Sequence, residues 1–192
     1  MTGTGPLEPP LESPLGVVLC GGASRRMGAD KSILEYEGVP MARRVAEALA
    51  AGGCGDVVAV GGAPEALAAL GLRVVPDARP GEGPLAAIAS AVPSAGARAM
   101  VVAACDLPKL TGGVVARTLA ALRAGRGAAM ATSDGRHALC VALTPEAARS
   151  LVSLVAAGER SLGPALATIG ASPVEVDAEL LVNVNTPDDV RQ

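Results

Sequence analysis

The sequence predicts an α/β domain with a mostly parallel central sheet, and three observations lead to this fold class. Short apolar runs alternate along the chain with longer helical segments, as they do when a crossover helix follows each parallel strand. The first run, Leu15 to Cys20, is continuously apolar, which is typical of a parallel strand covered on both faces. Glycines or carboxylates follow several of the runs, at the positions where α/β sheets bind their ligands.

Each element is indicated by its own residues and by the glycine or proline beside it. One helix begins at Pro40 and ends at Ala51, just before Gly52-Gly53. Thr111 is placed to cap another helix. The predicted strands are 15–20, 56–60, 72–75, 98–105, 128–132, 137–143 and 174–176. The predicted helices are 40–51, 64–70, 84–92, 111–124, 145–157 and 162–169, with a last helical turn at 187–192.

The chain of 192 residues suits one ordinary domain. We expect residues 1–14, which are rich in proline and glycine, to form a disordered leader ahead of a single domain at 15–192. Residues 1–14 lack the basic start and the apolar centre of a signal peptide.

Composition excludes several classes of function. The chain has no Phe, no Trp and one Tyr, so it cannot build the aromatic platforms that stack nucleic-acid bases, and its net charge of −3 does not suit a polyanion. No window of 18 uncharged apolar residues predicts a membrane span. The four cysteines are far apart, which predicts reduced thiols in a cytoplasmic protein and no zinc site. The one histidine, His137, is expected to be a half-buried strand residue and not a catalyst.

The glycine-rich loop after the first strand reads LCGGASRRMGADK over residues 19–31. Three glycines let the backbone approach a phosphate and turn N–H groups toward it: Gly21, Gly22 and Gly28. Arg25, Arg26 and Lys31 add positive charge, which suits the roughly four negative charges of a triphosphate. The loop matches neither the Walker A pattern nor the dinucleotide pattern. The alternative is a surface loop whose glycines only make turns.

The same loop resembles the signature of the nucleotidyltransferases that activate sugars and cofactors, G-G-x-S-x-R-M-G-x-D-K. Every specified position is present: Gly21, Gly22, Ser24, Arg26, Met27, Gly28, Asp30 and Lys31. Within that superfamily the chain most resembles the molybdenum cofactor guanylyltransferases of the MobA type. Four later segments support the resemblance in chain order: PGEGPL at 80–85, CDLP at 105–108, GERSL at 158–162 and NVNTP at 183–187. The resemblance covers about residues 15–191 and implies the Rossmann-like three-layer sandwich of the nucleotide-diphospho-sugar transferases.

The resemblance implies transfer of GMP from GTP to the terminal phosphate of molybdopterin, with release of pyrophosphate and with Mg²⁺ as cofactor. The implied catalytic residues are Arg26 and Lys31, on the triphosphate and departing pyrophosphate, and Asp106, on the metal. The implied nucleotide-binding residues are Leu19, Cys20, Gly21, Gly22, Ser24, Gly28, Lys31, Asp77, Gly83 and Asp106. Both reactants are anions, so the protein must position them and screen their repulsion, and it needs no covalent nucleophile. Partners are then the two small-molecule substrates, with at most transient contact with other enzymes of molybdenum cofactor metabolism.

Asn183 and Asn185 alternate along a short extended segment, so both point the same way, and the resemblance places them near the acceptor. Simpler interpretations stay open, because Asp77 and Asp106 also suit turns and Asn185 also suits the start of a helix. The chain departs from the family at Cys20, where Ala is usual. Strand 56–60 also ends without the Asn that some members place near the base.

Two other functions fit the sequence. One is a cytidylyltransferase or another cofactor or sugar nucleotidyltransferase, and the other is a nucleotide-sensing partner protein without catalysis. The related cytidylyltransferases tend to have Ala-Gly in place of Gly21-Gly22 and to lack the Gly83-Pro84-Leu85 segment, so the resemblance implies GTP over CTP. The joint presence of Arg26, Lys31 and Asp106 favours an enzyme over a sensor.

Overall fold

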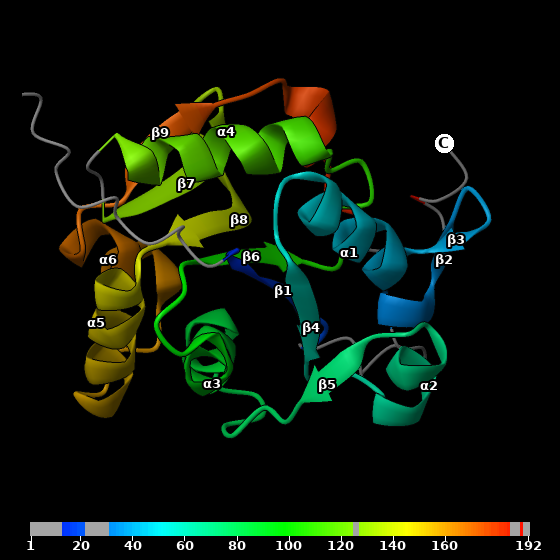
Figure 1. The fold of residues 1–192 in the computed structure, drawn as a ribbon, viewed down its shortest axis with the longest axis horizontal. Coiled ribbons are helices and arrows are strands. Elements are labelled where there is room, and N and C mark those ends of the chain that lie inside the picture. Colours follow the sequence, from blue (N-terminus) through cyan, green and yellow to red (C-terminus); the bar gives the residue numbers. More distant parts are fainter. Residues whose placement is uncertain (1–12, 22–30, 125–126, 185–188, 190–192) are drawn as a thin grey trace, which may run out of the picture.

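The computed structural model describes residues 13–21, 31–124, 127–184 and 189, with only the backbone of Lys31, Arg123 and Arg136. Its centre is a seven-stranded sheet in the order β5-β4-β1-β6-β8-β7-β9 (Figure 1). The strands are β1 (Leu15–Leu19), β4 (Asp56–Val60), β5 (Arg73–Val75), β6 (Met100–Ala104), β7 (Ala128–Ser133), β8 (Arg136–Leu143) and β9 (Ser172–Glu175). The predicted α/β class is confirmed.

The sheet has a parallel half and a mixed half. Strands β5, β4, β1 and β6 are all parallel, and β1 pairs with both neighbours in register over its whole length. Strand β8 runs antiparallel to β6 and β7, while β9 is parallel to β7. The ends of β1, β4, β5 and β6 therefore share one edge with the start of β8, and we call this the carboxyl edge.

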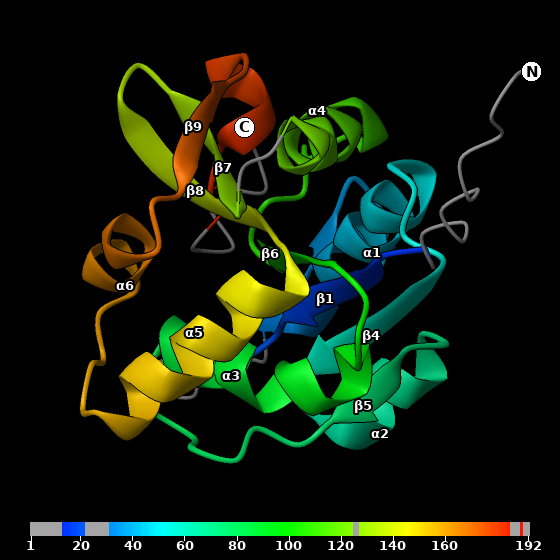
Figure 2. The same ribbon diagram turned by 60° about the vertical axis from the view of Figure 1, so that its left-hand side comes forward.

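Helices cover both faces of the sheet, so the domain has three layers (Figure 2). In Figure 1, α1 and α4 lie above the strands, and α3 and α5 lie below them. The helices are α1 (Met41–Ala51), α2 (Pro64–Ala69), α3 (Pro84–Ala95), α4 (Gly112–Arg123), α5 (Pro145–Ala156) and α6 (Leu162–Thr168).

Alternate residues of each strand divide between two cores. Val18 of β1 and Val101 of β6 pack in the core on the α1 and α4 side. Val17 and Val102 pack in the core on the side of α3, α5 and α6, which we call the α3 face. Alanine, valine and leucine fill both cores, and small side chains let the layers approach closely without aromatic residues.

Two helix starts follow from single side chains. The hydroxyl oxygen of Thr111 accepts a hydrogen bond from the backbone N–H of Val114 at 3.4 Å, so the predicted cap of α4 is confirmed. Thr144 caps α5 in the same way, accepting from the N–H of Ala147 at 3.2 Å.

The structure also contains elements that the sequence patterns did not predict. Residues 31–40 hold a short 3-10 helix, η2 (Lys31–Ile33), and a hairpin of β2 (Glu35–Tyr36) and β3 (Val39–Pro40). Two-residue strands are too short to show an alternating pattern, although the turn at Glu37-Gly38 has positive φ at both residues, as tight hairpins require. Helix α3 runs three residues past its predicted end, through Pro93, and η3 (Ala178–Leu181) follows β9.

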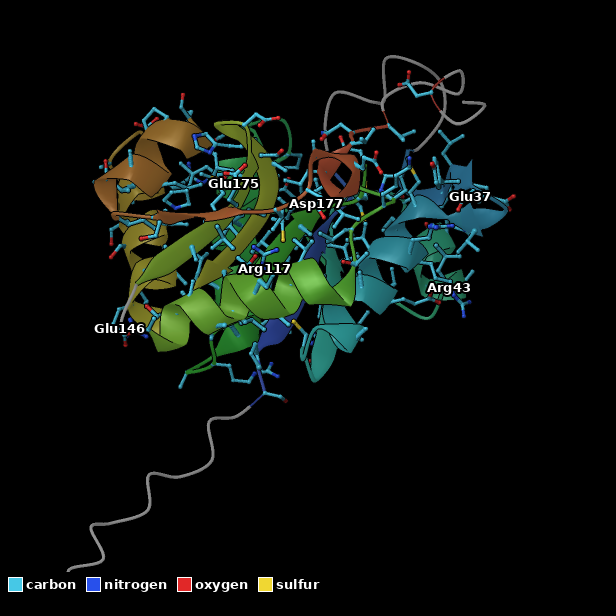
Figure 3. The ribbon with its side chains drawn as sticks, turned by 90° about the horizontal axis from the view of Figure 1, so that it is seen from above. Glu37, Arg43, Arg117, Glu146, Glu175 and Asp177 are labelled. Carbon is cyan, nitrogen blue, oxygen red and sulfur yellow. The ribbon has the colours of Figure 1, made fainter. Side chains whose placement is uncertain are left out.

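The edge strand β9 is held by polar contacts of Glu175. Its carboxylate accepts hydrogen bonds from the Thr132 hydroxyl at 2.9 Å and from the backbone N–H of Asp134 at 2.8 Å. Its carbonyl oxygen accepts from Arg117 on α4, and Figure 3 labels both residues. These bonds fix the mixed half of the sheet at its open side.

Residues 1–12 of the predicted leader lie outside the described residues, as does most of the predicted last turn. The carbonyl of Pro14 accepts a hydrogen bond from Gly55, so the domain is ordered from at least that residue. The division at residue 15 stays a prediction. Across the described part of the chain, none of the helices has the length and hydropathy to span a bilayer.

Candidate functional site

The carboxyl edge collects most of the described candidate residues. Leu19 ends β1 and is followed by Cys20 and Gly21, and Gly61 comes directly after β4. Asp77 is the second residue after β5, and Asp106 is the second residue after β6. Segments that lie far apart in the sequence thus meet because their strands are parallel neighbours.

Gly21, which comes two residues after β1, lies against Gly61 at the end of β4 and near Asp77 after β5. A Cβ built on Gly21 would stand 3.8 Å from Oδ2 of Asp77 and 3.8 Å from Cα of Gly61. A Cβ on Gly61, whose φ is +74°, would stand 3.0 Å from both N and Cα of Gly21. Glycine at position 61 therefore lets two strand ends touch backbone to backbone. The Gly61-Gly62 pair after a strand was the signal for this contact, and the sequence analysis assigned it no role.

Asp77 is half-buried, and its two carboxylate oxygens differ in surroundings. Oδ1 accepts a hydrogen bond from the backbone N–H of Arg79 at 3.0 Å and lies 3.5 Å from the hydroxyl of Ser90 on α3. Oδ2 is the oxygen that faces Gly21. The turn interpretation of Asp77 is thus correct for Oδ1, and Oδ2 remains directed at the loop proposed to bind phosphate.

Asp106 stands in the turn after β6, and its Oδ1 atom is fully buried. Its carbonyl oxygen accepts a hydrogen bond from the N–H of Val184 at 2.9 Å, which brings the segment that holds Asn183 beside this turn. Its two neighbours in the chain, Cys105 and Leu107, are buried in the core on the α1 and α4 side.

Arg44 of α1 supports the same turn, and the sequence analysis missed it. Its Nε donates to the carbonyl of Pro108 at 3.1 Å, and its Nη1 donates to the carbonyl of Tyr36 at 3.1 Å. Its guanidinium lies 5.2 Å from the centre of the Tyr36 ring and pairs with Glu37 at 3.0 Å. The unpredicted hairpin thereby anchors the turn that carries Asp106.

Gly83 closes the loop before α3, with a φ of +91° that favours glycine. Beside it, Glu82 pairs with Arg160 at 2.9 Å and with Arg79 at 3.4 Å. The segments 80–85 and 158–162, which resemble family motifs, are therefore joined by the ion pair between Glu82 and Arg160. No role was assigned to Arg160 from the sequence, although its GERSL segment was noted.

The turn around Arg160 is stiffened by its neighbour Glu159. The Glu159 carboxylate accepts hydrogen bonds from the backbone N–H groups of Ser161 at 2.7 Å and Arg160 at 2.8 Å. These bonds lower the pKa of the Glu159 carboxyl below its ordinary value, because they favour its charged form. The turn therefore keeps its anchor at neutral pH.

Several predicted site residues lie outside the described part of the chain, namely Gly22, Ser24, Arg26, Gly28 and Asn185. Lys31 begins η2, Leu19 and Cys20 are buried, and Asn183 is exposed. His137 is the second residue of β8 and pairs with Thr132 of β7. It is exposed, whereas the sequence predicted a half-buried residue. The reason is that β8 extends past the end of its neighbour β6.

A metal ion would have few protein ligands here. Within the described ranges, no group of three or more His, Cys, Asp and Glu side chains could hold one. A single carboxylate such as Asp106 matches ions that are bound by one or two carboxylates and by the phosphates of a substrate.

A family model described as "MobA-like NTP transferase domain" matches residues 16–171. The chain belongs to this family. Among curated relatives of this MobA-like chain, the molybdenum cofactor guanylyltransferase of Rhodobacter capsulatus is 36% identical over 91% of this chain and 92% of its own. The protein of that name from Xanthomonas euvesicatoria is 32% identical over 90% of each chain.

Solved structures agree with the MobA-like assignment. Molybdopterin-guanine dinucleotide biosynthesis protein A from Archaeoglobus fulgidus has a TM-score of 0.73 and 26% identity, over 92% of this chain and 95% of that chain. A 4-diphosphocytidyl-2C-methyl-D-erythritol synthase from Anaerococcus prevotii reaches a TM-score of 0.75 at 9% identity, over 92% and 94% of the two chains. The second likeness concerns the fold alone. The MobA-like chain is a nucleotidyltransferase, and the predicted family and fold are confirmed.

Proposed function

We propose that this enzyme transfers GMP from GTP to the terminal phosphate of molybdopterin and releases pyrophosphate. The observation that carries the proposal is the likeness to relatives named molybdenum cofactor guanylyltransferase, which extends over about nine-tenths of both chains. The product is the guanine dinucleotide form of the molybdenum cofactor.

The donor nucleotide is assigned to the parallel half of the carboxyl edge. Gly21 and Gly61 pack backbone to backbone there, and Oδ2 of Asp77, which faces Gly21, is assigned to a nucleoside hydroxyl or base donor. Arg26 and Lys31 are assigned to the triphosphate because they belong to the loop that begins at Gly21. Gly83, at the start of α3, is assigned to the same nucleotide.

Mg²⁺ is the proposed metal, and Asp106 is the residue proposed to hold it. The buried Oδ1 of Asp106 is a hard carboxylate oxygen, and burying a charged oxygen is costly unless donors or a cation accompany it. When bound, the ion supplies positive charge that offsets the charge of the phosphates during transfer.

The protein's own part in the reaction is positioning and electrostatics. An oxygen of the acceptor phosphate forms a bond to the α-phosphorus of GTP as the bond from that phosphorus to the bridging oxygen of the β-phosphate breaks. The electron pair of the broken bond leaves with pyrophosphate. Arg26 and Lys31 offset the charge that grows on pyrophosphate, and Asn183 and Asn185 are assigned to the acceptor.

The alternatives differ in the nucleotide used and in turnover. A cytidylyltransferase would prefer CTP, a sugar nucleotidyltransferase would not use molybdopterin, and a sensor would bind GTP without forming pyrophosphate. Pyrophosphate release should therefore be measured with each of the four nucleoside triphosphates and molybdopterin. Release with GTP well above that with CTP is expected, and equal or faster release with CTP would move the enzyme to the cytidylyltransferases.

A binding measurement also tests the preference for GTP over CTP. GTP with Mg²⁺ should raise the melting temperature more than CTP does at equal concentration, because the tighter ligand stabilises the folded state more. We further propose a cytoplasmic location, in line with four cysteines that are all buried and form no disulfide.

A further inference from the structure

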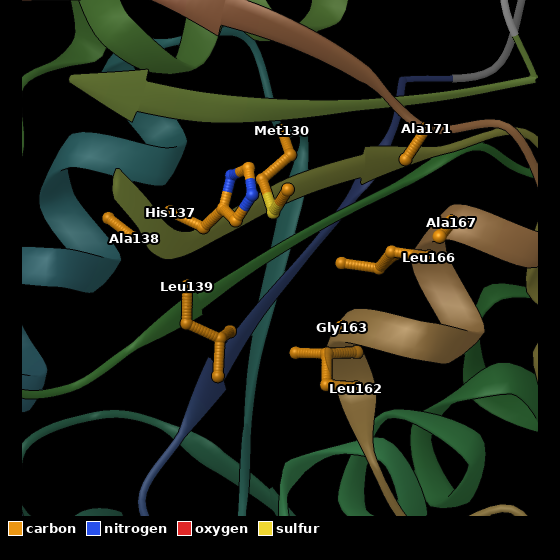
Figure 4. Close-up of a pocket in the computed structure, with 9 residues that line it drawn as sticks. All are labelled: Met130, His137, Ala138, Leu139, Leu162, Gly163, Leu166, Ala167 and Ala171. Carbon is orange, nitrogen blue, oxygen red and sulfur yellow. The ribbon is translucent and has the colours of Figure 1, made fainter. Parts of the chain in front are cut away.

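An open cavity of about 250 Å³ lies between α6 and the β7–β8 hairpin (Figure 4). Met130, His137 and Leu139 line it from the sheet, and Leu162, Gly163 and Leu166 line it from α6. Among the described residues that line it, His137 has the only polar side chain. In Figure 4 the His137 ring stands beside the Met130 side chain.

The cavity and Asp106 lie at the same edge of the sheet. Ala103 of β6 pairs with Cys140 of β8, and β8 continues beyond this pair to Arg136, so His137 lies past the end of β6, at the same edge of the sheet as the turn that carries Asp106. Alternation directs His137 and Leu139 to the α3 face, where Leu139, Met130 and Leu166 join one core. Cys105 and Leu107, which flank Asp106, are both buried in the core on the other face of the sheet.

The cavity also lies on the opposite side of Asp106 from the donor residues. In the sheet order, β1, β4 and β5 stand on one side of β6, whereas β8 and β7 stand on the other. The first three strands lead to Gly21, Gly61 and Asp77. A transfer reaction needs its two substrates on opposite sides of the reacting phosphorus, and the cavity occupies the side that the nucleotide leaves open.

The lining fits a flat heterocycle better than a charged group. Leucine and methionine side chains offer apolar faces for ring packing, and a thioether adapts well to an aromatic ring. The imidazole of His137 can exchange hydrogen bonds with a ring nitrogen or carbonyl. A cavity of about 250 Å³ is below the usual size for a drug-sized ligand, so it suits one fused ring system and not a whole nucleotide.

We propose that this cavity binds the fused pterin ring of the acceptor, with its phosphate directed toward Asp106. This inference rests on the proposed function and adds to it the position of the acceptor's ring system. Gly163 is central to it, because the missing side chain leaves the helix side of the cavity open. A Cβ at Gly163 would meet nothing within 4 Å, and its φ is not in the region that favours glycine.

Gly163→Leu is therefore the decisive variant, because leucine can fill the cavity without backbone strain. Gly113→Leu is the matched control: Gly113 also lies in the first turn of a helix, has no positive φ, and stands near only the Thr111 hydroxyl at 3.7 Å. We expect Gly163→Leu to raise the KM for molybdopterin roughly tenfold or more, with the melting-temperature shift caused by GTP unchanged. Gly113→Leu should leave both quantities unchanged.

A second variant, His137→Ala, tests the cavity even if Gly163→Leu does not fold. His137 is exposed, so His137→Ala should fold normally and should raise the KM for molybdopterin several-fold. Equilibrium binding should be measured in parallel by titrating molybdopterin and following its intrinsic pterin fluorescence. This readout needs no turnover.

The outcomes separate the two proposals. An active wild-type enzyme whose KM for molybdopterin is unchanged in both Gly163→Leu and His137→Ala overturns the cavity and leaves the proposed function standing. A wild-type enzyme that binds molybdopterin in a Gly163→Leu-sensitive manner, yet releases no pyrophosphate with GTP, supports the cavity and overturns the proposed function. A wild-type dimer that Gly163→Leu converts to a monomer would make the cavity a subunit interface and overturn the acceptor assignment.

Discussion

The two halves of the sheet end at the same carboxyl edge in different ways. In the parallel half, β1 and β4 end in glycines that pack backbone against backbone, and a carboxylate follows β5. In the mixed half, β7 and β8 form a hairpin that projects beyond β6, and an apolar cavity lies under it. The first arrangement places glycine backbone and a carboxylate at the edge, while the second places apolar side chains there. One sheet thus offers two different chemistries on either side of Asp106.

The largest expected effect comes from the residue between the halves. Asp106→Asn keeps the shape of the side chain and removes its charge, so turnover should fall roughly 10³-fold and GTP binding should lose its dependence on Mg²⁺. Steady-state kinetics and thermal shifts with and without Mg²⁺ measure these effects.

Asp56→Asn is the matched control for this change, because Asp56 starts β4 at the opposite edge and pairs only with exposed or half-exposed arginines. It should keep normal activity. Normal turnover in a folded Asp106→Asn enzyme would contradict the proposal that Asp106 holds the metal ion.

The second largest effect, on turnover, is expected at Lys31, at the end of the glycine-rich loop at residues 19–31. Lys31→Ala should lower turnover roughly 10²-fold, since it removes positive charge that offsets the growing charge of pyrophosphate. The melting temperature without ligand should stay nearly constant, because a loop lysine contributes little to folding. Full activity in the folded variant would contradict the assignment of the triphosphate to residues 19–31.

The backbone contact between strand ends can be broken directly. Gly61→Ala places a Cβ 3.0 Å from Gly21 at a φ of +74°, so it should lower the free energy of unfolding by roughly 2–3 kcal/mol and weaken GTP binding. Gly71→Ala is the control, because its φ is +79° but nothing lies within 4 Å of the added Cβ. It should cost only about 1 kcal/mol. Urea denaturation and GTP titration of both variants test whether the difference lies in the contact with Gly21.

The smallest effect is expected at the outer end of the parallel half. Asp77→Asn keeps an oxygen for the N–H of Arg79 and alters the group that faces Gly21. The KM for GTP should rise about fivefold, with kcat nearly unchanged, because one hydrogen bond to the bound nucleoside is weakened. If Asp77→Asn instead loses metal dependence, the roles of Asp77 and Asp106 are exchanged.

The sequence was a good guide to the parallel half and a poorer one to the rest. The strand at Asp56–Val60 was predicted to the residue, because apolar runs bounded by glycine mark buried parallel strands well. The hairpin at Glu35–Pro40 was missed, since two-residue strands carry no periodicity. The contact of Gly61 with Gly21 and the cavity at His137 depend on register between distant strands, and a local pattern contains no information about register.

The hydrogen bond from Val184 to Asp106 also bears on how the molecule matures. The Asp106 turn leaves the ribosome long before Val184 is made, and domains assemble as their later segments emerge. Val184 packs with Tyr36 and Met41, so the late segment closes on the hairpin that holds Arg44 and, through it, the turn. A nascent chain that already has its whole parallel sheet would still lack this closure. Catalytic competence is therefore tied to synthesis of the last segment, well after the sheet itself can form.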